Sequence, residues 1–265
     1  MQIYGDVPTL TARPLAEEQQ GIDHRLYGFL EPDENYSVFK WVKSAAREIR
    51  KVWSENKVPV VVGGTGFYLQ TLIKGISPVP QVEEEIRAEI RKRFEQQGYE
   101  AFLKDFQQKD PQFAFTDTQR VLRAAEVLAQ TGKSVTYWQS LPFQKEIEAD
   151  FLCFLTDLPR ETLYDRCNRR FEVMMKNGAV EEVKALLAKN PPRDSLILKA
   201  VGVCEIQALL NNEMTEKQAV EHACQMTRNY AKRQITWFKH RFFADMTVSD
   251  VKSPALLTKA LHFLE

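Results

Sequence analysis

The stretch Lys57-Val-Pro-Val-Val-Val-Gly-Gly-Thr-Gly66 decides the fold class of this chain. Its first half is a β-branched run, which is typical of a strand buried on both faces of a sheet. The preceding residues 37–56 place apolar side chains at helical spacing, and residues 67–74 predict a second, shorter helix. The order of helix, buried strand, glycine turn and helix is typical of an α/β protein with a parallel sheet.

A helical segment interrupts this α/β pattern. After a break at residues 75–80, apolar residues recur every four positions along a charged helix, and a later helix is expected at 117–131. We therefore predict a helical insertion domain at residues 78–148. Residues 1–77 and 149–265 are expected to form the α/β core.

The second part of that core is expected to be mainly helical. The sheet resumes at residues 149–155 and ends with an edge strand at 244–249. Helices are expected at 160–177, 180–189, 201–211, 215–241 and 254–265.

Composition limits the classes of function. The chain has 265 residues, of which 44% are hydrophobic, and its 36 Lys and Arg balance its 36 Asp and Glu. Nucleic-acid binding therefore requires that the basic residues gather on one face. The four cysteines show no paired spacing and the four histidines no metal-ligand spacing, so we predict neither a zinc site nor a disulfide scaffold. With no 18-residue apolar run and no leader-like start, the chain is predicted to be cytoplasmic.

The turn Gly63-Gly64-Thr65-Gly66 is a candidate ligand site, because ligands of open α/β sheets bind at the carboxyl ends of strands. Thr65 offers a hydroxyl at the start of a helix. The alternative is that Thr65 only caps that helix. The turn matches neither GxGxxG nor a Walker A sequence, so its spacing does not decide between the two interpretations.

Two helices carry candidate RNA-binding residues. Arg120 and Arg123 share a helix face beside Gln119, although charges at helical spacing are often only a solvated face. The stronger signal is the long helix, which has five basic residues and no acidic one between Arg228 and Arg241. Its interleaved aromatic residues suit contact with phosphates and bases. The alternative is that the aromatic side chains are core anchors and the charges cover the outside.

Three blocks of the sequence resemble signatures of the tRNA dimethylallyltransferases, also called tRNA isopentenyltransferases. They are VPVVVGGTGFYLQTLIKGI (58–76), DTQRVLRAAEVLAQTGK (117–133) and TRNYAKRQITWFKHR (227–241). The beginning, MQIYGDVPTLTARP, is similar to the family's stretch DSMQVY…TAKP. The likeness runs over essentially the whole chain, and the last block is highly specific.

This resemblance implies both a fold and an activity. The fold would be a P-loop-NTPase-like parallel sheet core, with its first βα unit missing, and an inserted all-helical domain that grips a tRNA anticodon stem-loop. The activity would be transfer of the dimethylallyl group of dimethylallyl diphosphate to N6 of the adenosine 3′ of the anticodon, after that adenosine is flipped into a channel. Mg²⁺ would help the diphosphate to leave. We expect a monomer.

The resemblance also assigns residues by position. Thr65 corresponds to the channel threonine that contacts the target nucleotide. The implied tRNA-contacting residues are Met1, Gln2, Arg87, Gln119, Arg120, Val121, Leu122, Arg123, Thr227, Arg228, Asn229, Tyr230, Ala231 and Lys232.

Two departures from the family pattern affect the expected activity. The family's phosphate loop and the general-base aspartate of its Asp-Ser pair would fall upstream of Met1, so we expect these 265 residues alone to turn over poorly. Cys204 stands where the family usually has an arginine facing the diphosphate. The rival hypotheses are a non-catalytic RNA-binding remnant of the same family and a small-molecule kinase of the P-loop class.

Overall fold

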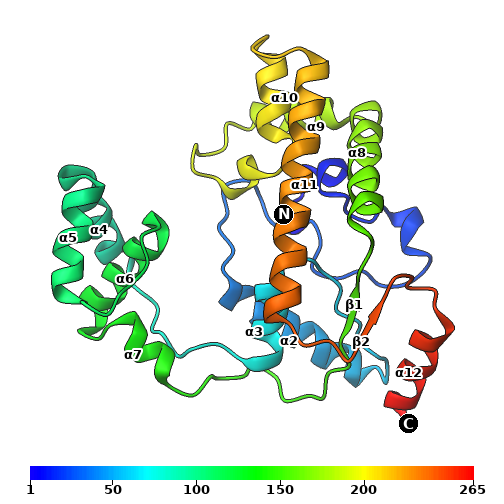
Figure 1. Cartoon of the computed structure of the whole chain (residues 1–265), viewed down its shortest axis with the longest axis horizontal. Helices are drawn as coiled ribbons and strands as arrows, with labels where there is room; N and C mark the ends of the chain where they lie inside the picture. The colour runs from blue at the N-terminus through cyan, green and yellow to red at the C-terminus, as the bar shows by residue number, and fades with distance from the viewer. The chain divides into compact units, whose positions relative to one another are not determined.

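The computed structural model describes all 265 residues and divides them into two compact units. Unit 1 comprises Met1–Gln70 and Glu148–Glu265, and unit 2 comprises Thr71–Ile147. Helices dominate both units (Figure 1). The α-helices are α1 Pro8–Thr11, α2 Val38–Ser54, α3 Gly66–Lys74, α4 Glu84–Gln97, α5 Tyr99–Lys109, α6 Thr118–Thr131, α7 Val135–Ser140, α8 Arg160–Lys176, α9 Ala179–Ala188, α10 Val203–Leu210, α11 Glu216–Arg241 and α12 Pro254–Leu264. Short 3₁₀ helices cover Ala16–Gln19 and Leu196–Lys199, and the strands are β1 Phe154–Thr156 and β2 Met246–Val248.

The longest helix, α11, organises unit 1. Its start is fixed by Thr215, whose hydroxyl accepts a hydrogen bond from Gln218 N while Gln218 Oε1 accepts one from Thr215 N. This reciprocal pair is a capping box. Small buried residues, Ala219 and Ala223, let α8 and α10 pack closely beside it (Figure 1). The predicted helix at 215–241 is confirmed.

A buried carboxylate ties α10 to α11. Glu205 is only 6% exposed. One of its oxygens accepts from Gly202 N at 3.0 Å, and the other lies 2.9 Å from His222 Nδ1 on α11. A buried carboxylate is costly unless its oxygens are paired, and both oxygens are paired here.

The sheet is smaller than the sequence predicts. β1 and β2 are parallel, with Phe154 opposite Met246 and Thr156 opposite Val248. They are the two strands of the single sheet. The chain is therefore mostly helical with a small parallel sheet.

The predicted buried strand at 57–62 is wrong. The run is extended but pairs with no strand, and Val60 and Val62 are 79% and 76% exposed. A β-branched run becomes a strand only where a neighbouring strand accepts its hydrogen bonds, and Pro59 has no N–H to offer.

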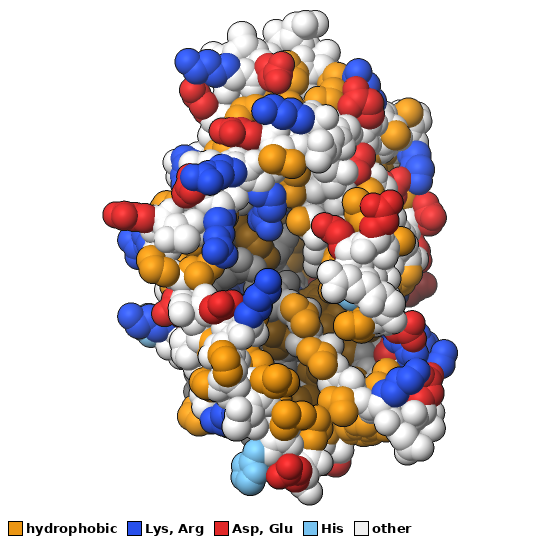
Figure 2. Space-filling model, turned by 90° about the vertical axis from the view of Figure 1, so that its right-hand side faces the viewer, with side chains coloured by type: hydrophobic (Ala, Val, Ile, Leu, Met, Phe, Trp, Pro, Cys, Tyr) orange, Lys and Arg blue, Asp and Glu red, His pale blue; other side chains and the backbone are white.

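Apolar side chains of α12, including Leu257 and Leu261, are exposed as well. Figure 2 shows apolar side chains gathered in the lower half of one face of the molecule.

Unit 2 is helical and has its own core. Phe102, Phe106 and Val121 are essentially inaccessible to solvent and pack where α4, α5 and α6 meet. Asp117 caps α6 by accepting from Arg120 N at 3.0 Å. Ile76 and Gln144 exchange two backbone hydrogen bonds of 3.0 and 2.9 Å, which brings the two ends of the unit together.

No helix of either unit combines the length and the apolar character needed to cross a lipid bilayer.

Candidate nucleic-acid interface

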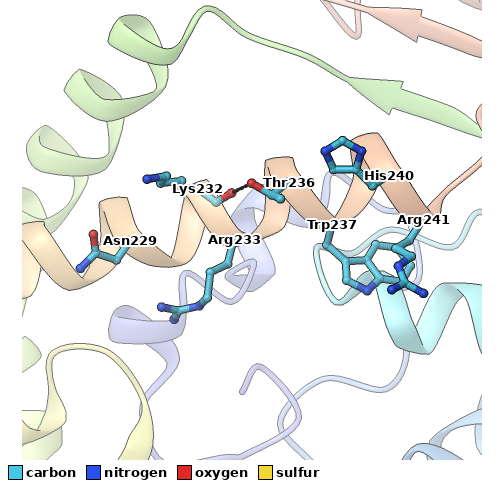
Figure 3. Close-up of a pocket in the computed structure, with 7 residues that line it drawn as sticks. All are labelled: Asn229, Lys232, Arg233, Thr236, Trp237, His240 and Arg241. Carbon is cyan, nitrogen blue, oxygen red and sulfur yellow. Dashed lines mark hydrogen bonds between the residues drawn. The ribbon is translucent and has the colours of Figure 1, made fainter. Parts of the chain in front are cut away.

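A basic groove runs along the C-terminal half of α11. It has a volume of about 670 Å³. Its side chains lie in two adjacent rows of four-residue spacing, which place them on neighbouring stripes of one helix face (Figure 3). The lining residues are Asn229, Arg233, Trp237 and Arg241 in one row and Lys232, Thr236 and His240 in the other.

The positive charge of this groove is not neutralised within the chain. Lys232, Arg233 and Arg241 form no salt bridge, and their stretch of α11 contains no acidic residue. Arg233 instead lies over the ring of Tyr230, with 5.6 Å from the guanidinium carbon to the ring centroid. Unpaired cations beside an exposed aromatic ring are suited to a polyanion that also carries planar bases.

The glycine turn before α3 packs against the same helix. Gln234 Nε2 donates to Gly64 O at 2.9 Å, and Gln70 Nε2 of α3 donates to Arg241 O at 3.0 Å. A Cβ on Gly64 would overlap the Gln234 carboxamide, and one on Gly66 would overlap the Trp237 ring. A Cβ on Gly66 would therefore displace the Trp237 ring, and one on Gly64 would displace the carboxamide that donates to Gly64 O.

Thr65 is exposed in this turn. Its carbonyl oxygen accepts from Tyr68 N at 2.9 Å, and its hydroxyl has no hydrogen-bond partner within the chain. The alternative that the Thr65 side chain only caps the next helix is therefore not what the structure shows. The hydroxyl is available to a ligand.

Several other predicted contact residues of unit 1 already have intramolecular partners. Gln2 Nε2 donates to Ala12 O at 2.8 Å, while Met1 is exposed. The Arg228 guanidinium donates to Asn168 Oδ1 at 2.6 Å and to Gln225 Oε1 at 2.7 Å, which joins α11 to α8. Thr227 Oγ1 donates to Ala223 O, and Asn229 Oδ1 accepts from Gln225.

The arginines predicted in unit 2 each lie beside an acidic residue of the same helix or its cap. Arg87 pairs with Glu84 at 3.4 Å, Arg120 with Asp117 at 3.1 Å and Arg123 with Glu126 at 3.5 Å. The Arg120 guanidinium also lies 4.7 Å from the ring centroid of Phe115. Gln119 is exposed next to them.

Two predicted contacts must be corrected. Val121 is fully buried in the core of unit 2, and Ala231 is 7% exposed where α11 faces its own unit. A ligand cannot reach their side chains, because each lies on the inward face of its helix. Leu122 also packs against the core of unit 2.

The set of contact residues predicted on α11 ends at Lys232, whereas the groove continues to Arg241, about two and a half turns further along the helix. Arg233, Trp237, His240 and Arg241 line the groove as well. The signal was present in the sequence, because the basic run continues to Arg241 without an acidic residue. The role of Gln234 carries no comparable signal in the sequence.

Cys204 lies exposed on α10, where its thiol donates to Leu198 O at 3.4 Å. Partial burial, and secondarily the neighbouring Glu205 carboxylate, raise the pKa of the thiol. A thiol carries no positive charge in either protonation state, so Cys204 supplies none of the positive charge that an arginine would place here.

The structure shows no cluster of side chains that could hold a metal ion without the help of a substrate. No three His, Cys, Asp or Glu side chains gather at one point, and the side chains lining the groove are amide, hydroxyl, aromatic or basic. Mg²⁺ prefers carboxylate and other oxygen ligands. No residue of this chain is therefore assigned to a metal.

Comparison with known proteins shows the family. Residues 2–241 match the IPP transferase family. A tRNA dimethylallyltransferase of Sinorhizobium medicae is 42% identical over 246 residues, covering 91% of this chain and 81% of that protein. One from Azorhizobium caulinodans is 39% identical, covering 91% and 79%. The crystal structure of a tRNA isopentenylpyrophosphate transferase from Staphylococcus epidermidis superposes with a TM-score of 0.66 at 27% identity, covering 100% of this chain and 87% of that one. The chain belongs to the IPP transferase family, in which its relatives are tRNA dimethylallyltransferases.

Proposed function

We propose that this chain transfers a dimethylallyl group from dimethylallyl diphosphate to N6 of the adenosine 3′ of a tRNA anticodon. The observation that carries the proposal is the unpaired basic groove of α11 directly beside the turn that presents Thr65. The family of the chain supports the reaction type. A P-loop-NTPase-like core and a cytoplasmic location, where tRNA is modified, belong to the same proposal.

The groove supports binding of the RNA backbone. Lys232, Arg233 and Arg241 would contact phosphates, which releases counterions and gives affinity without sequence readout. Trp237 and Tyr230 offer aromatic faces for bases or sugars. In unit 2, Arg87, Arg120 and Arg123 would exchange their single intrahelical carboxylate for phosphate oxygens.

In the proposed reaction, the Thr65 hydroxyl contacts the flipped target adenosine. The N6 amine attacks C1 of the dimethylallyl group, a C–N bond forms, the C–O bond to the diphosphate breaks, and N6 releases one proton to water. Diphosphate departs with the bonding electron pair. The sequence contains no GxxxxGK[ST] motif, and Cys204 is neutral, so we expect these 265 residues by themselves to turn over slowly.

The deciding experiment incubates the chain with dimethylallyl diphosphate and an anticodon stem-loop, and measures prenylated adenosine by mass spectrometry. Slow, RNA-dependent transfer supports the proposal. Salt-sensitive RNA binding with no transfer at all would favour the non-catalytic RNA-binding protein. Nucleotide binding without salt-sensitive RNA affinity would favour a small-molecule kinase.

Replacing Lys232 with glutamine is expected to weaken stem-loop binding at low salt and to lower the slope of log K against log salt by roughly one, because one phosphate contact is lost. Fluorescence anisotropy over a salt series measures both quantities. Lys252→Gln removes an equally exposed charge outside the groove and should leave both unchanged. Equal effects of the two variants would mean that net charge, and not the groove, binds the RNA.

A further inference from the structure

The turn that carries Thr65 is hydrogen-bonded to α3 on one side, where Thr65 O accepts from Tyr68 N and Leu69 N, but the residues that precede it have little support from their own part of the chain. Residues 58–62 belong to no helix or strand, and their four valines are exposed. Residues 58–64 make one hydrogen bond, in which Gly64 O accepts from Gln234 Nε2 on α11. A strand would normally hold the start of such a turn by its ladder of hydrogen bonds, and here the Gln234 side chain supplies the one hydrogen bond on that side of Thr65.

The packing around this hydrogen bond is specific. Gly64 lies against the Gln234 carboxamide and Gly66 against the Trp237 ring, each too closely to admit a Cβ. Thr65 lies between these two glycines in the sequence. At the other end of the contact, Gln70 donates to Arg241 O, a helix-end carbonyl that has no partner within α11. The turn and the first turns of α3 are thus held to α11 at both ends.

The Gln234 side chain contacts the glycine turn and not the groove. Asn229, Lys232 and Arg233 line the groove (Figure 3), and Gln234 is not among the residues that line it. Its carboxamide instead bridges 170 positions of sequence to reach Gly64. Gln234 thus contacts the turn that presents Thr65 and does not line the groove.

We propose that Gln234 is a positioning residue: its hydrogen bond to Gly64 O sets where the Thr65 hydroxyl stands relative to the basic groove of α11. This inference rests on the proposed function, because it takes the Thr65 hydroxyl to contact the target adenosine. A nucleophile held even slightly out of place loses a large part of the benefit of orientation. Gln234 therefore affects capture and transfer, while the groove retains its affinity for RNA.

The test replaces Gln234 with methionine, which keeps the length of the side chain and removes the donor. Gln207→Met is the matched control, because Gln207 is exposed on α10 and away from the turn. The stem-loop carries 2-aminopurine at the target position, whose fluorescence rises when the base is unstacked. The 2-aminopurine stem-loop gives the Kd and the fluorescence of the saturated complex. Because 2-aminopurine has no N6 amine, kcat and KM are measured with a stem-loop that carries adenosine at the target position.

We expect Gln234→Met to leave the Kd within twofold of the wild-type value, to reduce the fluorescence rise by about half, and to lower kcat about 10-fold with little change in KM. In a double-mutant cycle with Thr65→Val, Gln234→Met should add nothing further. The control should match the wild type.

Two outcomes overturn the inference and are distinct from failure of the proposed function. An unchanged fluorescence rise in Gln234→Met shows that the hydrogen bond does not set capture. Additive effects of the two variants show that Gln234 acts independently of Thr65. A wild-type chain that binds no stem-loop, or binds it without any fluorescence rise, overturns the proposed function first and the positioning role with it.

Discussion

Thr65→Val is expected to lower kcat for dimethylallyl transfer by about 10- to 100-fold, with the affinity for the stem-loop nearly unchanged. Valine keeps the shape of threonine and removes only the hydroxyl. That hydroxyl is exposed and has no partner within the chain, so its loss should cost no folding free energy. Single-turnover assays at saturating stem-loop measure the rate, and anisotropy measures the affinity.

The matched control for this prediction is Thr258→Val on α12, which makes the same chemical change at another exposed threonine. It should leave the rate unchanged. If Thr65→Val also transfers at the wild-type rate, the hydroxyl does not contact the reacting nucleotide, and the assignment of Thr65 by family resemblance fails.

Gly202→Ala is expected to destabilise unit 1 by about 3 kcal/mol, which corresponds to a fall in Tm of roughly 10 °C. Gly202 has a φ of +99°, which costs an alanine about 1–2 kcal/mol. A Cβ would also lie 2.8 Å from Leu10 Cδ2 and 2.9 Å from Phe171 Cε2, two side chains of the core. Thermal unfolding followed by circular dichroism measures the change.

The variant Gly178→Ala separates the cost of the left-handed backbone from the cost of the Cβ contacts. Gly178 has a similar φ of +93°, but nothing lies within 4 Å of the place where its Cβ would stand. Gly178→Ala should therefore cost only the backbone term, about 1 kcal/mol. Equal losses for the two variants would show that the contacts of a Cβ with Leu10 and Phe171 add nothing to the cost of the left-handed backbone.

The helices were predictable from the sequence because each carries its own signals. The spacing of apolar residues and the caps Thr215, Asp117 and Gly132 are local, so α6 and α11 begin and end close to the predicted residues. The run 57–62 was not predictable in the same way. Its β-branched composition describes a segment that fits a sheet, but whether a sheet is there depends on other segments.

In the candidate site too, some features follow from local sequence and others depend on tertiary packing. The basic face of α11 follows from residue spacing alone, because a regular helix fixes which side chains are neighbours. The burial of Val121 and Ala231 depends on which face of each helix packs inward, and a motif carried over by position does not state this. The contact between Gln234 and Gly64 depends on tertiary packing, for which the sequence holds no local pattern.

The paired backbone of Ile76 and Gln144 has a consequence for the evolution of the chain. The helical unit leaves and re-enters at two residues that are already hydrogen-bonded to each other, so its ends stay fixed whatever lies between them. Closing a long excursion costs free energy that grows only logarithmically with its length. Helices can therefore be added to this unit, removed from it or exchanged, while Ile76 and Gln144 keep their pairing.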